Sequence, residues 1–432
     1  MITVLISTFE VAMYEKTILD NGLRVVTSSL PNARSVCVSI YVGAGSRYEP
    51  SKTAGLSHFL EHLFFKGTER RSTPKIISET IEGIGGVLNA ATDREATVYW
   101  AKVPKSHFPV ALDLLIDMLK NSKFDPSEIE KERMVVLEEL NMVNEYPSHR
   151  AAAILDQLMW PDNSLGRDVA GTKESVSAIT RKHLLDYMGH QYVMPNMVVS
   201  VAGDIAHLEI VKIVNSLVTG WPTNKLLSLE TVVNNQCEPR FKIENRKTEQ
   251  AHICIGFHGL SAEDPDRFAL DLLCTVLGEG MSSRLFLEVR ENAGLAYDVH
   301  CSVDHLRDCG AFSVYAGVDP KKMDKAIRSI VGVLSSVKDG IPEVEMDKAR
   351  EFTKGRLLLR MEDTRAVTGW LGGQELLKGN ILTVNEVVEA LDRIKSCELE
   401  RIAGELLREE NMSMSIVGPY KKGERFQELM VL

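Results

Sequence analysis

The sequence repeats itself at a nearly constant offset, and this repeat limits the folds open to the chain more than any other feature. The segment VYWAKVP at Val98–Pro104 is matched by VYAGVDP at Val314–Pro320. The segment NMVVSVAG at Asn196–Gly203 is matched by NMSMSIVG at Asn411–Gly418. The two offsets differ by a single position, and each is close to half of the chain length. Two matches at one offset indicate a duplication in which each copy takes about half of the chain.

The duplication predicts two domains of like fold. We expect an N-terminal domain at residues 13–222, a linker at residues 223–240 and a C-terminal domain at residues 241–432, because Thr219–Arg240 holds two prolines and an Asn-Asn pair. A length of 432 residues suits two or three domains. A hydrophobic content of 44% and a charged content of 25% are typical of a globular protein.

One stretch of the first copy, Gly55–Thr68, reads GLSHFLEHLFFKGT and is apolar apart from a few residues. Helical periodicity places His58 and His62 on one face, with Glu61 beside them. Burying two imidazoles and a carboxylate without partners is costly, and a metal ion removes this cost because neutral imidazole is a good zinc ligand. The H-x-x-E-H order leaves Glu61 free to act as a base toward water. Two core histidines and a chance glutamate are the alternative interpretation.

A third metal ligand is expected on the helix Ser127–Glu145, where Glu138 and Glu139 compete. Their side chains point about 100° apart, and the neighbours of Glu139 at three and four residues are all apolar. Glu139 is therefore the preferred ligand, with Glu138 as the alternative. Glu132 lies seven residues before Glu139 on the same stripe and is a candidate for orienting a ligand histidine. Without the histidine motif, an exposed acidic face would be the preferred interpretation.

The second copy does not keep this chemistry. The repeat offset leads from the histidine motif to CTVLG at Cys274–Gly278, and from Glu139 to Gly355. We therefore expect the C-terminal copy to lack a metal site and to complete the cleft, bind substrate or support assembly. It does place Arg290 and Tyr297 seven residues apart near a glycine, and such a pair can donate hydrogen bonds to a developing oxyanion. A surface arginine and a core tyrosine are the alternative interpretation.

Charge and cysteine content exclude several classes of protein. The net charge of −10 argues against a nucleic-acid partner, which would require a basic face. Seven scattered cysteines without a C-x-x-C motif indicate reduced thiols rather than a disulfide framework. The start at Met1–Ala12 lacks a basic region, so we expect an extension before the fold begins near Met13 rather than a signal peptide. No apolar run is long enough for a membrane span, and we expect a cytoplasmic protein.

Six motifs of this chain together resemble the pitrilysin/insulinase family of zinc peptidases. They read LDNGLRVV, GLSHFLEHLFFKGT, IGGVLNAATDREATVYWAKV, ERMVVLEEL, NMVVSVAGD and SSRLFLEVRENAGLAY. The resemblance runs from about Met13 to about Tyr420 and is closest to the mitochondrial processing peptidases and their bacterial homologues. It implies an α+β fold with two homologous domains. Each domain would be a mostly antiparallel sheet covered by helices, and the two would face each other as a clam.

The resemblance also implies roles for individual residues. It makes His58, His62 and Glu139 the ligands of one zinc ion per chain and Glu61 the catalytic base, with Glu132 behind the ligands. The His62-to-Glu139 spacing is one residue longer than in the processing peptidases, which keeps Glu138 open. The remaining assignments are Arg290 and Tyr297 as catalytic residues, and Asn89, Ala90, Ala91 and Thr92 as a substrate-binding edge strand.

The function implied by the resemblance is a zinc-dependent endopeptidase that cleaves extended or unfolded peptides. The peptide would add as a strand in a cleft between the two halves. Processing peptidases carry acidic residues that read a substrate arginine at positions that fall near His149 and Ala153 here, which puts that preference in doubt. The chain keeps both the zinc motif and the Arg–Tyr pair, so we expect a self-sufficient homodimer. A non-catalytic scaffold or partner subunit of a processing-peptidase-like complex is the alternative.

Overall fold

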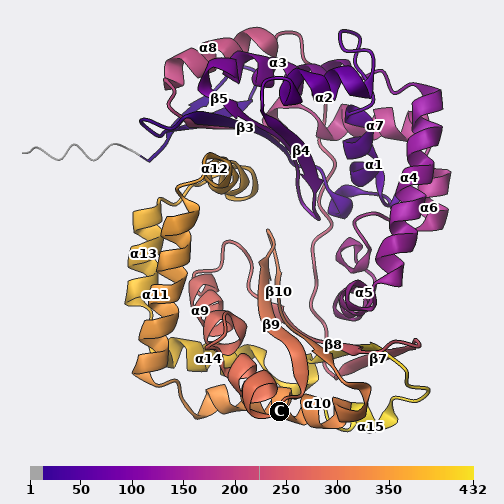
Figure 1. Ribbon diagram of the computed structural model, residues 1–432, viewed down its shortest axis with the longest axis vertical. Helices are drawn as coiled ribbons and strands as arrows, with labels where there is room; N and C mark the ends of the chain where they lie inside the picture. Colours follow the sequence, from indigo (N-terminus) through magenta and orange to yellow (C-terminus); the bar gives the residue numbers. More distant parts are fainter. Residues whose placement is uncertain (1–12, 223) are drawn as a thin grey trace, which may run out of the picture.

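The computed structural model describes residues 13–222 and 224–432, which form two halves that face each other, each built on one β-sheet (Figure 1). The first sheet has the order β1-β2-β6-β3-β5-β4 and the second the order β7-β11-β8-β10-β9. Each sheet contains one parallel pair, β2 with β6 and β7 with β11, and its other pairs are antiparallel. The expected α+β fold of two mostly antiparallel halves is confirmed.

The first half contains six strands and eight α-helices among its described residues. The strands are β1 (Glu15–Ile18), β2 (Arg24–Ser29), β3 (Ser35–Val42), β4 (Val87–Thr92), β5 (Thr97–Pro104) and β6 (Met197–Gly203). The helices are α1 (Leu56–Phe64), α2 (Pro74–Glu82), α3 (Phe108–Asn121), α4 (Pro126–Glu145), α5 (Pro147–Met159), α6 (Lys173–Ala178), α7 (Arg181–Gln191) and α8 (His207–Leu217). A hairpin turn at Asn21-Gly22 joins β1 to β2, and Gly22 has the positive φ of 87° that such a turn needs.

The second half follows the same plan. Its strands are β7 (Arg240–Asn245), β8 (Ala251–Gly259), β9 (Ala296–His305), β10 (Gly310–Val318) and β11 (Ser413–Gly418). Its helices are α9 (Arg267–Gly278), a π-helix at Phe286–Asn292, α10 (Met323–Ser336), α11 (Glu343–Arg360), α12 (Thr364–Lys378), α13 (Val384–Arg393), α14 (Ser396–Leu406) and α15 (Glu424–Gln427). Between α8 and β7 the described residues form neither helix nor strand.

The offset seen in the sequence relates the two halves element by element. It carries the first residues of β2 and β3 onto those of β7 and β8, and the first residues of α3 and α7 onto those of α10 and α14, to within a single position. The same offset carries α4 onto α11 and α5 onto α12 to within a few residues. The duplication inferred from two short motifs therefore extends over the whole fold.

One helix of each half packs against the sheet of the other half, and Figure 1 shows these two helices, α5 and α12. Helix α5 packs on β8 and β11 of the second sheet, where Ser415 Oγ donates to the carbonyl of Ala151 at 2.7 Å. Helix α12 packs on β3 and β6 of the first sheet, where the hydroxyls of Ser39 and Thr368 are 2.8 Å apart. Because these two helices are counterparts in the repeat, the exchange is symmetric. The boundaries at residues 222 and 241 stay a prediction, since a cut there would separate α5 and α12 from the sheets that they cover.

The tips of two hairpins also meet across the halves. Arg47 in the loop before α1 is buried and pairs with Glu95 in the β4–β5 turn at 2.5 Å. Arg47 pairs as well with Asp308 in the β9–β10 turn at 2.8 Å. Glu95 in turn accepts from the backbone N–H of Arg307 at 3.0 Å. These buried bonds fix the turn after β4 against the second half.

No helix among residues 13–222 and 224–432 combines the length and the apolar character needed to cross a bilayer.

Candidate metal and catalytic site

The histidine motif lies on α1, a short helix that is buried on most sides. Leu56, Phe59, Leu60, Leu63 and Phe64 are at most 2% exposed and pack into the core of the first half. The three polar positions between them, His58, Glu61 and His62, are only half-buried and lie where α1 faces β4 and α4. Burial of the apolar face therefore holds the polar face in one orientation.

The start of α1 is fixed by a buried carboxylate. Gly55 has a φ of 96°, and a Cβ there would lie 2.6 Å from the carbonyl oxygen of Ala170. Glu49, only 4% exposed, accepts the backbone N–H groups of Gly55 and Ser57 at 2.6 Å each. A carboxylate at this end satisfies free N–H groups and complements the helix dipole. Burial nevertheless raises the pKa of Glu49, against the effect of these hydrogen bonds.

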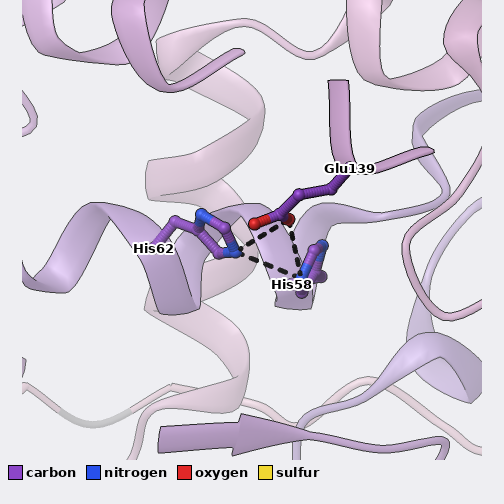
Figure 2. A group of neighbouring side chains, drawn as sticks. All are labelled: His58, His62 and Glu139. Atoms are coloured by element: carbon purple, nitrogen blue, oxygen red, sulfur yellow. Dashed lines mark hydrogen bonds and ion pairs between the residues drawn. The ribbon is translucent and has the colours of Figure 1, made fainter. Parts of the chain in front are cut away.

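Three of the expected ligands converge on one point. His58 Nε2 and His62 Nε2 are 3.1 Å apart, and Glu139 Oε2 lies 3.4 Å from His62 Nε2 and 3.8 Å from His58 Nε2. Figure 2 shows the carboxylate of Glu139 reaching the two imidazole rings from the neighbouring helix. Among the described residues, this is the one group of three or more such side chains whose ligand atoms lie within 4.8 Å of one another.

These distances fit a zinc ion. Tetrahedral zinc with bonds of about 2.0–2.2 Å keeps its nitrogen and oxygen ligands about 3.3–3.6 Å apart, and the observed spacings bracket that range. Burial, and then the neighbouring His62, lower the pKa of His58 to about 4, so its ring is neutral near pH 7. A neutral imidazole offers a lone pair to a metal.

The choice between the two candidate glutamates on α4 is made by the packing of α4 against α1. Glu138 is exposed and accepts from the side-chain amide of Asn141 at 3.2 Å. Glu139 is the one that meets the histidines. Its apolar neighbours Val135 and Met142 are 44% and 50% exposed, so they border the site rather than bury the carboxylate.

Glu132 lies behind His62 on the same helix face as Glu139. Its Oε1 is 2.9 Å from His62 Nδ1, and its Oε2 is 2.5 Å from Lys66 Nζ. Burial would raise the pKa of Glu132, but the hydrogen bonds to His62 and Lys66 hold it below its usual value. Burial would likewise lower the pKa of His62, but the bond to Glu132 and nearby carboxylates raise it. The contact directs His62 Nε2 toward the cluster.

Glu61 does not join the ligand cluster. Its Oε2 accepts a hydrogen bond from Thr92 Oγ1 at 2.5 Å. Burial raises the pKa of Glu61, and the hydrogen bond from Thr92 opposes that rise. A carboxylate beside the ligands but outside the cluster is available as a base.

The segment assigned to substrate binding is the edge strand β4. Strand β4 pairs with β5 on one side and ends the first sheet on the other. Its exposure alternates, with Val87, Asn89 and Ala91 outward and Leu88, Ala90 and Thr92 partly buried. An exposed strand edge next to α1 can accept an extended peptide as a further strand.

A cavity of about 630 Å³ lies between the two halves and is lined by residues of both. Val143, one turn after Glu139, lines it from the first half together with His149 and Ala153. Strand β9 contributes Asp298 and His300 from the second half. The cavity therefore borders the position where the resemblance places an arginine subsite.

Arg290 and Tyr297 are brought together, but apart from the ligand cluster. The Arg290 guanidinium lies 5.3 Å from the centre of the Tyr297 ring and 4.7 Å from that of Phe286. Tyr297 is 74% exposed at the start of β9, so it is not the core residue of the alternative interpretation. Within the described chain, no hydrogen bond or ion pair joins either residue to the cluster. Their catalytic role stays a prediction.

Sequence reasoning missed the supporting roles of Glu49, Lys66 and the Thr92 hydroxyl. Glu49 lies in a loop, where no periodicity marks a partner. Lys66 follows His62 by four residues, and that spacing was a usable signal for a shared side. The role of Thr92 depends on how β4 packs beside α1, which the sequence does not show.

Comparison with known proteins then assigns the chain to a family. Residues 24–173 match the family "Insulinase (Peptidase family M16)", and residues 178–352 match "Peptidase M16 inactive domain". A Bacillus subtilis relative, "Uncharacterized zinc protease YmxG", is 35% identical over 94% of this chain and 98% of its own length. The chain belongs to peptidase family M16. An Arabidopsis thaliana relative, "Probable mitochondrial-processing peptidase subunit beta, mitochondrial", is 32% identical over 93% of this chain and 78% of its own length.

Solved structures show that the fold is shared at low sequence identity. A protease from Helicobacter pylori superposes with a TM-score of 0.86 at 23% identity, covering 94% of this chain and 99% of that one. A chain of Complex III2 from Candida albicans superposes with a TM-score of 0.80 at 19% identity, covering 97% of this chain and all of that one. The same fold thus occurs in a protease and in a chain of Complex III2, so the functional inference must rest on the site.

Proposed function

We propose that this M16 protein is a zinc endopeptidase that cleaves extended or unfolded peptides. The observation that carries the proposal is the convergence of His58, His62 and Glu139, with the carboxylate of Glu61 beside this cluster but outside it. The names of two relatives support it, since YmxG and a relative from Mycobacterium leprae, 37% identical, are both called zinc proteases. We propose one zinc ion per chain, held by those three residues.

The residues around the cluster divide the work of hydrolysis. When bound, the zinc ion supplies Lewis-acid polarisation and lowers the pKa of a water molecule toward about 7. Glu61 takes the proton of the attacking water and returns it to the leaving amine. Glu132 holds His62 through its Nδ1 and is held in turn by Lys66. The base and the two histidine ligands therefore have separate roles on α1, and α4 supplies the third ligand.

The edge strand supports binding of an extended peptide. Asn89, Ala90, Ala91 and Thr92 offer main-chain groups that an incoming strand can pair with. Main-chain pairing tolerates many sequences, so side-chain preference would come from the cavity between the halves. We propose further that Arg290 and Tyr297 donate hydrogen bonds to the developing oxyanion from the opposite side.

The test of the proposal is the replacement Glu61→Gln. This variant keeps the size of the side chain but cannot accept the proton, so peptide turnover should fall by about 10²–10⁴-fold with zinc content unchanged. Mass spectrometry of a peptide-library digest measures turnover, and metal analysis measures zinc. The exposed Glu138→Gln is the matched control and should behave as wild type. Near-normal turnover by Glu61→Gln would contradict the mechanism.

The alternative is a non-catalytic partner subunit. Such a subunit would have the same fold. Its role would not require three converging ligand side chains with the carboxylate of Glu61 beside them. Wild-type protein that bound no zinc and cleaved no peptide, but that captured a second family member, would favour the alternative.

We also propose a homodimer that works in the cytoplasm. One chain carries both the ligand cluster and the Arg290–Tyr297 pair, which supports a unit that needs no second gene product. All seven cysteines are free thiols, as suits a reducing compartment. Light scattering at several concentrations tests the dimer, and a molar mass of about one chain throughout would contradict it.

A further inference from the structure

We propose that Thr92 is a positioning residue that orients the catalytic base, Glu61, and so ties the base to the strand that docks the peptide. The inference rests on the proposed function. The assignment made from the sequence treated Thr92 only as part of the substrate-binding edge. The structure adds a contact of its side chain, since Thr92 Oγ1 donates to Glu61 Oε2 at 2.5 Å.

The path of β4 explains why this hydroxyl points at the base. Thr92 is the last residue of β4 and shares its face with Leu88 and Ala90, both of which pack against the core of the first half. Helix α1 packs against β4 on that same side. The alternation of the strand therefore turns Asn89 and Ala91 outward and Thr92 toward Glu61.

The hydroxyl has one proton to donate, and Glu61 receives it. A separation of 2.5 Å is in the range of a hydroxyl donating to an ionised carboxylate. Only Oε2 of Glu61 is held in this way, so its other oxygen is free of this contact. A base that is fixed through one oxygen keeps the other in a constant direction, which is what proton transfer requires.

The position of Thr92 is itself secured by the strand across from it. Thr92 is paired in register with Thr97 of β5, and their hydroxyls are 3.5 Å apart. Thr97 is fully buried and donates to the carbonyl of Ala44 at 2.8 Å. Three residues after Thr92, Glu95 binds Arg47 and the second half. The end of β4 is thus held on both sides.

Strand β4 would therefore position both the bound peptide and the catalytic base. The backbone of β4 sets the position of the docked peptide, and the side chain at its last residue sets the direction of the base. An error in the geometry of either would cost turnover, because a misplacement of about 1 Å can cost about 10²-fold. Peptide binding itself should depend on the β4 main chain and not on the hydroxyl.

The kinetic test compares Thr92→Val with Thr92→Ser. Valine keeps the shape and the strand preference but lacks the hydroxyl, so kcat should fall about 10- to 100-fold while KM and zinc content stay within about twofold. Serine restores the donor and should recover most of kcat. Thr80→Val on α2 is the matched control, because it removes the hydroxyl of a half-buried residue in the same half that bonds to the carbonyl of Ile76 rather than to the base or to Thr92. It should keep kcat within about threefold.

Three results would contradict the positioning role of Thr92. Wild-type kcat in Thr92→Val would exclude a positioning role, and so would a serine variant as slow as the valine variant. An equal loss of kcat in Thr80→Val would assign the effect to the loss of a hydroxyl in this half rather than to the contact with Glu61. Failure of the proposed function looks different, because wild type and Glu61→Gln would then be equally inactive.

A second measurement does not depend on turnover. Melting temperatures of the zinc-loaded full chain are compared for Thr92→Val, Glu61→Ala and the double variant. The two changes should be non-additive, because either one alone removes the same hydrogen bond. Additive shifts would overturn the contact even if the protein cleaved no peptide.

Discussion

Helices α1 and α9 occupy equivalent places in the two halves but are packed in opposite ways. The repeat offset carries His58 onto Cys274, Glu61 onto Leu277 and His62 onto Gly278. In α9 these positions are buried, and a Cβ on Gly278 would lie 2.4 Å from the backbone nitrogen of Cys301 in β9. In α1 the same positions are half-buried polar side chains that face α4 and β4.

The carboxylate-bearing helices differ in the same sense. Glu139 of α4 meets the histidines of α1, whereas its counterpart Gly355 of α11 has no atom within 4 Å of where a Cβ would be. In the first half, polar side chains meet between α1, α4 and β4. In the second half, Cys274, Leu277 and Gly278 are buried and α9 packs directly on β9. One fold thus accommodates either a polar site or a packed core at the same place.

The largest expected effect comes from His58→Ala against its counterpart Cys274→Ala. His58→Ala should lose most of its zinc and lower peptide turnover by about 10³-fold or more, because several kcal/mol of charge stabilisation by the metal is lost. Cys274→Ala should keep one zinc per chain, which metal analysis measures. Full zinc occupancy in His58→Ala would contradict the proposal that α1 binds the metal and α9 does not.

The second prediction tests whether the second half contributes to chemistry. Tyr297→Phe should lower kcat by about 10²–10³-fold at nearly unchanged KM and zinc content, because it removes one oxyanion donor. Its 74% exposure means that stability should not change. Tyr420→Phe in the same half, whose hydroxyl bonds to the carbonyl of Pro320, is the control and should turn over as wild type. If Tyr297→Phe and Tyr420→Phe had equal kcat values, Tyr297 of the second half would have no part in catalysis.

A smaller effect is expected from Glu132→Gln, which weakens the hold on His62. Zinc affinity should fall about 10- to 100-fold, as is typical when a partner behind a ligand is altered. Competition with a chromogenic chelator measures it. Glu130→Gln on the same helix is the control, since that carboxylate is exposed and pairs with Arg133. If both variants bound zinc equally well, Glu132 would have no role at the site.

The smallest expected effect is on stability and compares two glycines of the second half. Gly278→Ala should lower the free energy of unfolding by about 1–3 kcal/mol, because the new Cβ meets the β9 backbone. Gly355→Ala should be neutral or raise it by up to about 1 kcal/mol, since the helix has space there and alanine favours helix. Urea unfolding measures both. A tolerated Gly278→Ala would mean that α9 is not closed against β9.

Local patterns in the sequence determined much of this protein. The repeat could be detected in the sequence because duplicated strands keep their apolar alternation. The structure shows that the same offset relates further elements, from β2 and β7 to α7 and α14. The histidine pair could be singled out from the sequence, because two imidazoles in an apolar helix are costly without a partner. The helix predicted at Ser127–Glu145 is observed at Pro126–Glu145, one residue longer at its start.

Only the tertiary structure decided the features that depend on how elements far apart in the sequence meet. The sequence favoured Glu139 but left Glu138 open, and the packing of α4 against α1 brings Glu139 to the histidines. The exchange of α5 and α12 depends on which sheet offers an uncovered apolar face. The contact of Thr92 with Glu61 depends on the register of β4 beside α1. Periodicity fixes which face of an element is buried, but the partner of that face is fixed by packing in three dimensions.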